Sequence, residues 1–392
     1  MPAAFFVYAS IALAMAVNAI RGPSPPTSRF PALWLPAVLM AEVPWMWLLL
    51  RVLIAALLIA AGALDMTIGR IALVLLITAQ SLQVVLIVRA SRSARRIAGD
   101  RSAAAWWERL TGWPYRIPPE ISRIDDIEYA PGLTLDLYRP HEPPPGPAPC
   151  LVYAHGGSWG GGDPRRVFRP VVHYLASRGW VVLTIRYPLS PLATFPEHLI
   201  GVKRALQWAK TAGVTQFGVD AERIAVAGGS AGAHLAALAA LTTSTDQLGF
   251  AQFDTSVKAA VVLYGIYDFV NRNGARYDWP LIPERVMKVA VSAAPDAYRA
   301  ASPIDQVRSD APPFLVVHGT SDSLVPIAEA RHFVEALGAV EAPVDFLKVE
   351  FAQHAFDILN GVRTRALAVR IERFLNVMVG VAPLDAEPVD GA

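Results

Sequence analysis

Hydrophobic positions fill the first part of the chain almost without interruption, in three runs over residues 3–20, 44–64 and 71–88. Each run approaches the roughly 20 apolar residues that a helix needs to cross the hydrocarbon of a bilayer. The first and third runs carry no charged side chain, and the second carries only Arg51. That arginine either forms an ion pair or a lipid contact within the membrane or extends its guanidinium to the nearer interface. The pattern predicts an all-α membrane anchor of about three helices over residues 1–90.

A further apolar stretch, residues 30–43, is broken by Pro31 and Pro36 and contains Glu42 near its end. This composition favours an interfacial or re-entrant segment, and a fourth span is the alternative. Removal of the first run as a secretory signal is a second alternative, but that run lacks the basic residues that precede the apolar core of a signal. Indole rings suit the headgroup level of a membrane, and three occur in this region: Trp34, Trp45 and Trp47.

Five arginines follow the third run within a short distance: Arg89, Arg92, Arg95, Arg96 and Arg101. Cytoplasmic loops of membrane proteins carry an excess of arginine and lysine. The turn between the second and third runs, residues 65–70, carries only one aspartate and one arginine. We therefore expect a multi-pass protein of the cell membrane whose following domain lies in the cytoplasm. The arginine cluster is also suited to anionic lipid headgroups.

Beyond the anchor and a basic, aromatic linker over residues 91–123, the pattern becomes that of a globular domain, residues 124–380. Short runs rich in β-branched residues alternate there with helical patterns. Such alternation predicts an α/β fold, a mostly parallel central sheet with helices on both faces. The expected strands are 124–129, 133–138, 150–154, 180–187, 223–227, 257–264, 313–318 and 344–349. The expected helices are 167–177, 198–212, 232–241, 326–336 and 363–377.

Two stretches depart from this alternation. Residues 271–301 form an insertion rich in Tyr, Trp, Pro and Met. That composition is typical of a lid over an active site. Residues 381–392 form a tail that we expect to be disordered.

Composition narrows the classes of function. The 392 residues are 54% hydrophobic and 17% charged, with a net charge of +2. No basic stripe interleaved with aromatic residues is present, so nucleic acid is not expected as a partner. Cys150 is the single cysteine, which excludes an intramolecular disulfide. Histidine, cysteine and carboxylate residues are not clustered at metal-ligand spacing, so no metal is expected.

The most specific motif is Gly228-Gly229-Ser230-Ala231-Gly232, between an apolar strand pattern and an Ala/Leu-rich helix pattern. In such a turn the serine lies at the tip in a strained conformation, and glycines flank it because larger residues would collide with neighbouring elements. The positive end of the helix points to the site of the serine oxygen. The alternative, a phosphate-binding turn, is disfavoured because no lysine follows. The motif predicts Ser230 as a nucleophile.

A second motif, His155-Gly156-Gly157-Ser158-Trp159-Gly160, directly follows an expected strand. A loop without bulky side chains can present backbone N–H groups to an oxyanion, and one such donor contributes roughly 3–4 kcal/mol to catalysis. We expect Gly157 and Ser158 to supply donors, together with the N–H of Ala231 after the nucleophile. The alternative for the loop taken alone is a tight turn, and its pairing with the turn at Ser230 favours the oxyanion-binding interpretation.

A nucleophilic serine needs a base and a carboxylate that orients it. Asp322 follows a strand pattern that ends in His318-Gly319, and His354 follows the last strand pattern. Their chain order, serine, acid, histidine, is that of hydrolases with this kind of turn. Other candidates are weighed against them: Asp305, Asp310 and Asp357 among carboxylates, and His234, His318 and His332 among histidines. Asp322 and His354 are the predicted acid and base.

Together these motifs resemble the bacterial hormone-sensitive-lipase-like esterases of the α/β-hydrolase fold, and within them the membrane-anchored members. The resemblance covers about residues 124–377, and further similar stretches are 264–268, 302–303 and 311–315. It implies hydrolysis of hydrophobic carboxylic esters, often with short or medium acyl chains, and no metal or organic cofactor. It leaves the natural substrate and the oligomeric state open.

The chain also departs from that family. Ser158 occupies the position of the third glycine of the family's oxyanion loop, and Tyr187-Pro188 replaces its usual Tyr-Arg. Both changes put the preferred acyl-chain length in doubt. Kynurenine formamidases share the architecture, so amide hydrolysis is the alternative activity. The plant gibberellin receptor shares it without the catalytic histidine, so a binding or scaffold role is the non-enzymatic alternative.

Overall fold

A computed structural model describes residues 1–21, 33–99, 120–166, 168–242, 253–276 and 279–381. The chain forms two compact units. The first comprises Met1–Tyr115, Gly319–Leu324 and Val349–Leu367, and the second comprises Arg116–His318, Val325–Lys348 and Ala368–Ala392. The sequence predicts an anchor over residues 1–90, a linker over 91–123 and a catalytic domain over 124–380. In the structure, two later segments, Gly319–Leu324 and Val349–Leu367, group with the N-terminal helices. Residues 100–119 of the expected linker, with Trp106, Trp107 and Trp113, and residues 382–392 of the tail lie outside the described residues.

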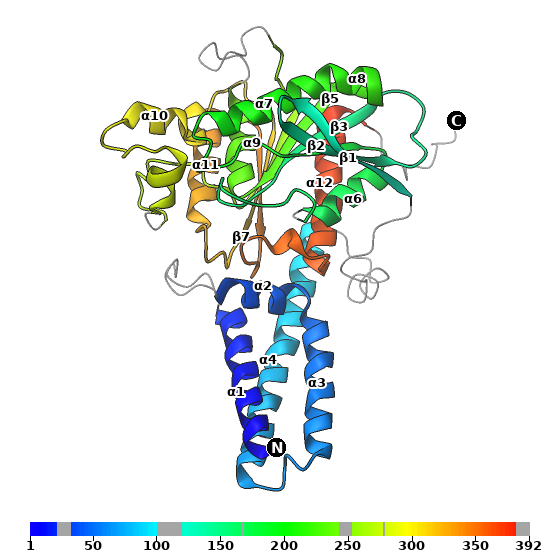
Figure 1. Ribbon diagram of the computed structural model, residues 1–392, viewed down its shortest axis with the longest axis vertical. Helices are drawn as coiled ribbons and strands as arrows, with labels where there is room; N and C mark the ends of the chain where they lie inside the picture. The colour runs from blue at the N-terminus through cyan, green and yellow to red at the C-terminus, as the bar shows by residue number, and fades with distance from the viewer. Residues whose placement is uncertain (22–32, 100–119, 167, 243–252, 277–278, 382–392) are drawn as a thin grey trace. The chain divides into compact units, whose positions relative to one another are not determined.

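The N-terminal part of the first unit is helical (Figure 1). Its helices are α1 (Pro2–Arg21), α2 (Trp34–Glu42), α3 (Pro44–Ala60) and α4 (Thr67–Ala98). By length and composition, α1 and α4 are able to cross a membrane. Helices α2 and α3 meet that criterion only as a pair, and the pair is bent by 94°. The described residues thus contain two helices able to span a membrane, or three when the bent pair is one span.

The second unit is built on an eight-stranded sheet with the order β1-β2-β4-β3-β5-β6-β7-β8. The strands are β1 (Ile121–Ala130), β2 (Leu133–Pro140), β3 (Ala148–Ala154), β4 (Val181–Ile185), β5 (Val219–Gly229), β6 (Ala259–Leu263), β7 (Phe314–Gly319) and β8 (Val344–Val349). The first two strands pair antiparallel, and β2 pairs antiparallel with β4. From β4 to β7 every pairing is parallel, as the alternating pattern predicts.

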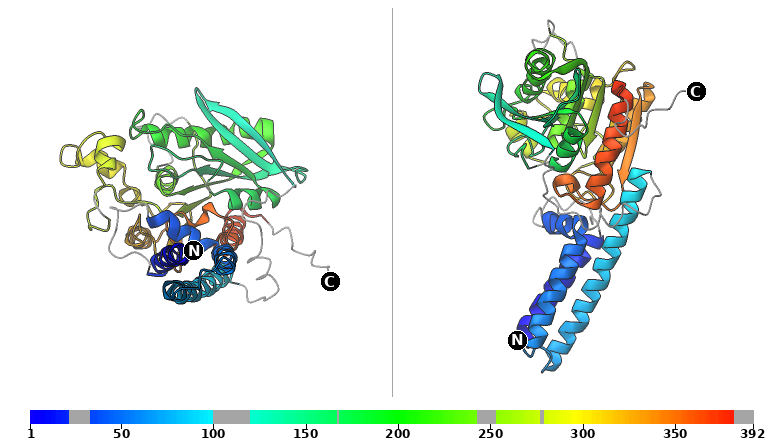
Figure 2. Two further views of the ribbon diagram at one scale, coloured as in Figure 1. Left: turned by 60° about the horizontal axis from the view of Figure 1, so that its bottom comes forward. Right: turned by 90° about the vertical axis from the view of Figure 1, so that its right-hand side faces the viewer.

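Helices cover both faces of the sheet (Figure 2). They are α6 (Arg169–Ser177), α7 (Glu197–Lys210), α8 (Ala212–Phe217), α9 (Ala231–Leu241), α10 (Pro295–Ala300), α11 (Ala328–Ala339) and α12 (Val362–Val379). Tyr174 and Arg178, in α6 and just after it, hydrogen-bond Glu372 in α12. These contacts join the two helices on one face of the sheet.

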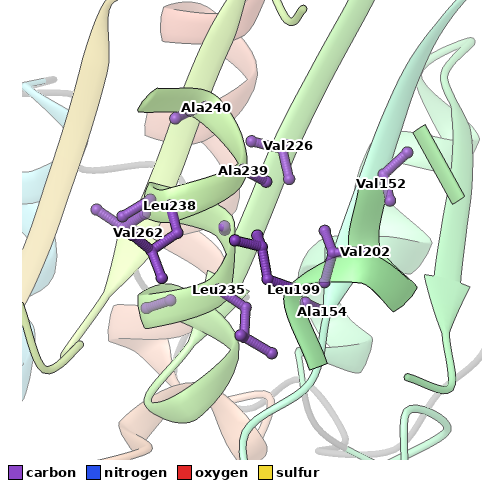
Figure 3. Close-up of a cluster of buried hydrophobic side chains, with 14 of the residues drawn as sticks. Val152, Ala154, Leu199, Val202, Val226, Leu235, Leu238, Ala239, Ala240 and Val262 are labelled. Atoms are coloured by element: carbon purple, nitrogen blue, oxygen red, sulfur yellow. The ribbon is translucent and has the colours of Figure 1, made fainter. Parts of the chain in front are cut away.

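The core lies between the parallel strands and the helices of the other face. Figure 3 shows side chains from β3, β5, β6, α7 and α9 meeting there, among them Val152, Val226, Val262, Leu199 and Leu238. Every residue of α9 is buried. Its composition explains this, because Ala, Leu and Gly let a helix pack on all sides. This central helix begins immediately after Ser230.

The expected elements recur with shifted ends. β5 begins at Val219, four residues before the expected strand, and the expected helix 198–212 is divided into α7 and α8. The described part of the insertion 271–301 contains one π-helical turn (Ile282–Val286) and the short helix α10. Residues 277–278 of the insertion lie outside the described residues.

Candidate active site

Ser230 lies at the sharp turn from β5 into α9, with φ 54° and ψ −119°. This positive φ is uncommon for a residue with a side chain and marks backbone strain. The N–H of Ser230 donates to the carbonyl of Leu263 at 2.9 Å, and its own carbonyl accepts the N–H of His234 at 3.1 Å. The turn is therefore fixed by the neighbouring strand on one side and by the first turn of the helix on the other.

The glycines around Ser230 are required by space. A Cβ on Gly228 would lie 2.1 Å from the carbonyl oxygen of Gly232, and a Cβ on Gly232 would lie 2.0 Å from that of Ala154. Real Cβ atoms do not approach backbone atoms so closely. This close packing agrees with the sequence analysis, in which glycines flank Ser230 because larger residues would collide with neighbouring elements.

The loop after β3 lies against this turn. A Cβ on Gly156 would be 2.9 Å from the carbonyl oxygen of Gly229 and 3.3 Å from the Cβ of Ser230. Gly157 has a φ of 134°, and a Cβ there would lie 2.2 Å from the carbonyl oxygen of Gly161. Ser158 has a φ of 55°, so serine adopts a left-handed conformation where the resembled family has glycine. The loop keeps its shape at the cost of strain at Ser158.

Two aromatic contacts hold the loop, and sequence reasoning missed both. The indole N–H of Trp159 donates to Nδ1 of His234 at 3.1 Å. The Nε2 of His234 lies 2.7 Å from the carbonyl of Ala301, so this nitrogen carries the proton. At the start of the loop, His155 stacks on the ring of Tyr187, whose hydroxyl donates to the carbonyl of His155 at 2.8 Å. In the sequence, only position indicates these roles. His155 and Trp159 belong to the loop motif, and His234 lies about one helical turn after Ser230.

Burial accounts for the state of these two histidines. It lowers the pKa of His234 to about 3, although its bond to Ala301 opposes the shift. Burial also lowers the pKa of His155, whose Nδ1 lies 2.8 Å from the carbonyl of Gly156. Both rings are therefore neutral at physiological pH. They serve the shape of the loop, and neither is suited to accept a proton from a nucleophile.

Asp322 and His354 contact each other within the first unit. Nδ1 of His354 lies 2.7 Å from Oδ2 of Asp322, and both residues are buried. The other oxygen, Oδ1, accepts the N–H of Leu324 at 2.9 Å. The two loops are tied by a backbone bond from the N–H of Ser321 to the carbonyl of Ala352 at 3.0 Å. This geometry fixes Nδ1 of His354 on a carboxylate, so that Nε2 is the ring nitrogen suited to proton transfer.

The competing residues have other contacts. His318 lies with Nε2 2.9 Å from the carbonyl of Val325, and Nδ1 of His332 lies 3.4 Å from the side-chain amide of Asn273. Asp305 pairs with Arg272, and Asp310 pairs with Arg308. Asp357 is buried in the first unit. These contacts differ from the acid–histidine pair of Asp322 and His354.

The structure thus gathers the predicted residues in two sets. Ser230, Ala231 and the loop from His155 to Ser158 belong to the second unit, and Asp322 and His354 to the first. Ser230 directly follows the carboxyl end of β5, and Asp322 follows that of β7, in the same sheet. Among the described residues, no group of three or more His, Cys, Asp or Glu side chains is arranged to hold a metal ion.

Comparison with known proteins finds relatives whose alignments cover most of the chain. The BD-FAE family model matches residues 135–337. The probable carboxylic ester hydrolase LipM of Mycobacterium tuberculosis is 41% identical over 282 residues, 70% of this chain and 65% of LipM. The chain thus spans slightly less than two thirds of LipM. Esterase LipC of the same organism is 38% identical over 74% of this chain and 76% of LipC.

Solved structures add an esterase with the same fold. Esterase Est2 of the planctomycete Thermogutta terrifontis, with propionate bound, superposes with a TM-score of 0.53 at 25% identity. The superposition covers 68% of this chain and 97% of Est2. The similarity therefore covers nearly the whole of that enzyme.

Proposed function

The chain belongs to the BD-FAE family and to the hormone-sensitive-lipase-like esterases that include LipM and LipC, and on that premise we propose that it hydrolyses carboxylic esters through an acyl-enzyme intermediate on Ser230. The observation that carries the proposal is the strained turn at Ser230, with Gly156 of the preceding loop packed against it. A serine in this conformation at a helix N-terminus is suited to nucleophilic attack.

In the proposed first step, Oγ of Ser230 forms a bond to the ester carbonyl carbon while Nε2 of His354 takes the hydroxyl proton. The C–O bond to the alcohol then breaks, and the alcohol leaves with that proton. In the second step water attacks the acyl-enzyme, His354 takes one of its protons and returns it to Ser230, and the acid is released. Asp322 would hold His354 in the required tautomer and stabilise its charged form.

The carbonyl oxygen becomes negative in both tetrahedral intermediates, and the proposed donors are backbone N–H groups. Ala231 would contribute from the first position of α9, and Gly157 and Ser158 from the loop after β3. The positive end of the α9 dipole would add to their effect. The strain at Ser158 supports a functional role for the loop, since strained residues persist where surrounding contacts hold them for a purpose.

The substrate that we propose is hydrophobic. The insertion 271–301 is joined to the fold by Arg276, whose Nε lies 3.1 Å from Oε1 of Glu329 in a buried ion pair. Its Nη2 also donates to the carbonyls of Asp268 and Phe269. We propose that this insertion contributes to the acyl pocket, as its aromatic composition indicates.

We expect the purified full-length protein to cleave p-nitrophenyl butyrate at least about 100-fold faster than the p-nitroanilide of the same acid, a difference of nearly 3 kcal/mol in activation free energy. The reason is that a phenolate leaves without protonation, whereas an amine must be protonated first. Release of nitrophenol and nitroaniline is followed in parallel at equal enzyme concentration. Equal or faster cleavage of the anilide would instead favour the amide-hydrolase alternative.

We further propose that the helices α1 and α4 cross the cell membrane and that the hydrolase domain faces the cytoplasm. The support is that α1 and α4 are long and apolar enough, and that Arg89, Arg92, Arg95 and Arg96 follow the apolar part of α4. The lipid bilayer is then a second partner of the protein.

Reporter fusions after residue 101 test this orientation. A reporter that is active only in the cytoplasm is expected to give signal, and one that is active only outside is expected to be silent, because arginines next to a span resist translocation. The reverse pattern would overturn the orientation. Fusions after residue 65 provide the control, since the loop there is expected outside.

A further inference from the structure

The segment that carries His354 has an unusual backbone. Phe351 and Ala355, on either side of His354, have φ values of 59° and 54°. Residues with side chains rarely adopt this left-handed conformation, and they keep it only where surrounding contacts hold them. Part of that support comes from the Asp322 loop. Further contacts come from the N-terminal helices of the same unit, next to which the segment lies in orange (Figure 1).

Helix α2 contacts the residue itself. The indole Nε1 of Trp34 donates a hydrogen bond of 2.8 Å to the backbone carbonyl of His354. Trp34 is half-buried. His354 is therefore held at two places, its carbonyl by Trp34 and its ring by Asp322.

The same helix also holds the end of the segment. Nη1 of Arg363 donates to Oε1 of Glu42 at 2.8 Å and to the carbonyl of Ala41 at 3.0 Å, and the Glu42 and Arg363 side chains are almost fully buried. Gly361 lies so close to α2 that a Cβ would be 2.5 Å from the carbonyl oxygen of Glu42. A buried, hydrogen-bonded ion pair has little freedom to rearrange, so this contact fixes where the segment meets α2.

Helix α4 supports the start of the segment. The guanidinium of Arg89 lies over the ring of Phe351 at 4.4 Å, and Arg96 pairs with Glu350. Two arginines of the cluster that we interpreted as a topology signal thus contact residues just before His354. The sequence pattern does not indicate these contacts, which depend on how α4 packs against the His354 segment.

We infer that α2 and the basic end of α4 form a positioning element for the candidate base His354, so that the N-terminal helices are part of the catalytic machinery as well as a membrane anchor. The inference rests on the proposed function. Trp34 is a positioning residue in it, because it acts on the reaction through His354. Helix α2 is joined directly to the apolar helix α3 through a 94° bend. The position of α3 therefore restricts the position of α2.

The test is Trp34→Phe in the full-length protein in detergent micelles. This change keeps an aromatic ring but removes the indole N–H that donates to the backbone carbonyl of His354. We expect kcat for p-nitrophenyl butyrate to fall about three- to tenfold, the rate equivalent of one hydrogen bond, at unchanged KM. The rate of labelling by a fluorophosphonate should fall by the same factor, because it also needs a well-oriented base.

Trp180→Phe is the matched control. The indole of Trp180, next to β4, donates to Oδ1 of Asn376 at 3.1 Å, and both residues belong to the second unit. We expect wild-type kcat and labelling for this variant. If Trp34→Phe has the wild-type kcat and labelling rate, as Trp180→Phe is expected to have, the inference is wrong.

Arg363→Lys tests the inference independently and replaces Trp34→Phe if that variant does not fold. It keeps the charge but replaces the guanidinium, whose Nη1 donates to both Ala41 and Glu42, so kcat and labelling should again fall at unchanged KM. Arg370→Lys, which weakens the pair with Asp345, is its control. Wild-type rates for Arg363→Lys would overturn the inference. Ser230→Ala is measured alongside: if it retains activity the proposed function fails, and if it is inactive while the positioning variants are normal, only the inference fails.

Discussion

Replacement of Ser230 by alanine is expected to lower kcat for ester hydrolysis by roughly 10⁴-fold or more, as removal of the nucleophile does in serine hydrolases. The fold should be unaffected, because alanine has the same Cβ and meets the same steric restriction at φ 54°. The measurement is p-nitrophenyl butyrate hydrolysis by purified protein, with thermal unfolding as a check on the fold.

Ser177→Ala is the matched control for this variant. Its hydroxyl donates to the carbonyl of Tyr174 at the end of α6, far along the chain from the candidate residues. We expect wild-type turnover for it. Turnover by Ser230→Ala above about 1% of wild type would contradict the nucleophile assignment, since the residual rate left by oxyanion donors and binding alone is far smaller.

The second large effect concerns the base. His354→Ala should be as inactive as Ser230→Ala, and the double variant no worse, because nucleophile and base act as one unit. Asp322→Asn should retain more activity than either, since it leaves both reacting groups in place and disturbs only the tautomer and orientation of His354. The three variants and the double variant are compared by kcat/KM.

His332→Ala is the control for this series, because His332 is half-buried and its ring contacts the side-chain amide of Asn273. It should have wild-type kcat/KM. If His332→Ala or His318→Ala removed activity and His354→Ala did not, the base would have to be reassigned. A double variant much worse than Ser230→Ala would show that His354 acts on a different step.

Local sequence patterns predicted the parallel sheet and the turn at Ser230 because both depend on short-range rules. β-branched runs that alternate with helical patterns are typical of crossover units, and all the parallel pairings from β4 to β7 follow that prediction. The turn needed glycines at fixed offsets from Ser230, and those offsets are visible in the sequence. The membership in an esterase family was also predicted, on the same motifs.

Contacts between distant residues were not predictable in this way. Trp34 and His354 are 320 positions apart, and no periodicity links them. The bond between Trp159 and His234 depends on how the loop after β3 packs on α9, which only the folded chain determines. The bend between α2 and α3 was partly visible, since Pro36 and Glu42 argued against a straight span, but its angle depends on packing.

The most direct measurement for the proposed mechanism is covalent labelling of the full-length protein with a fluorophosphonate, followed by mass spectrometry of its peptides. The account predicts one phosphonyl adduct, on the peptide containing Ser230, in the wild-type protein and hardly any in His354→Ala, because an unactivated serine does not react. A protein of this fold with only a binding or scaffold role would not be labelled. Absence of an adduct in active, folded protein, or an adduct on a different serine, would contradict Ser230 as the nucleophile.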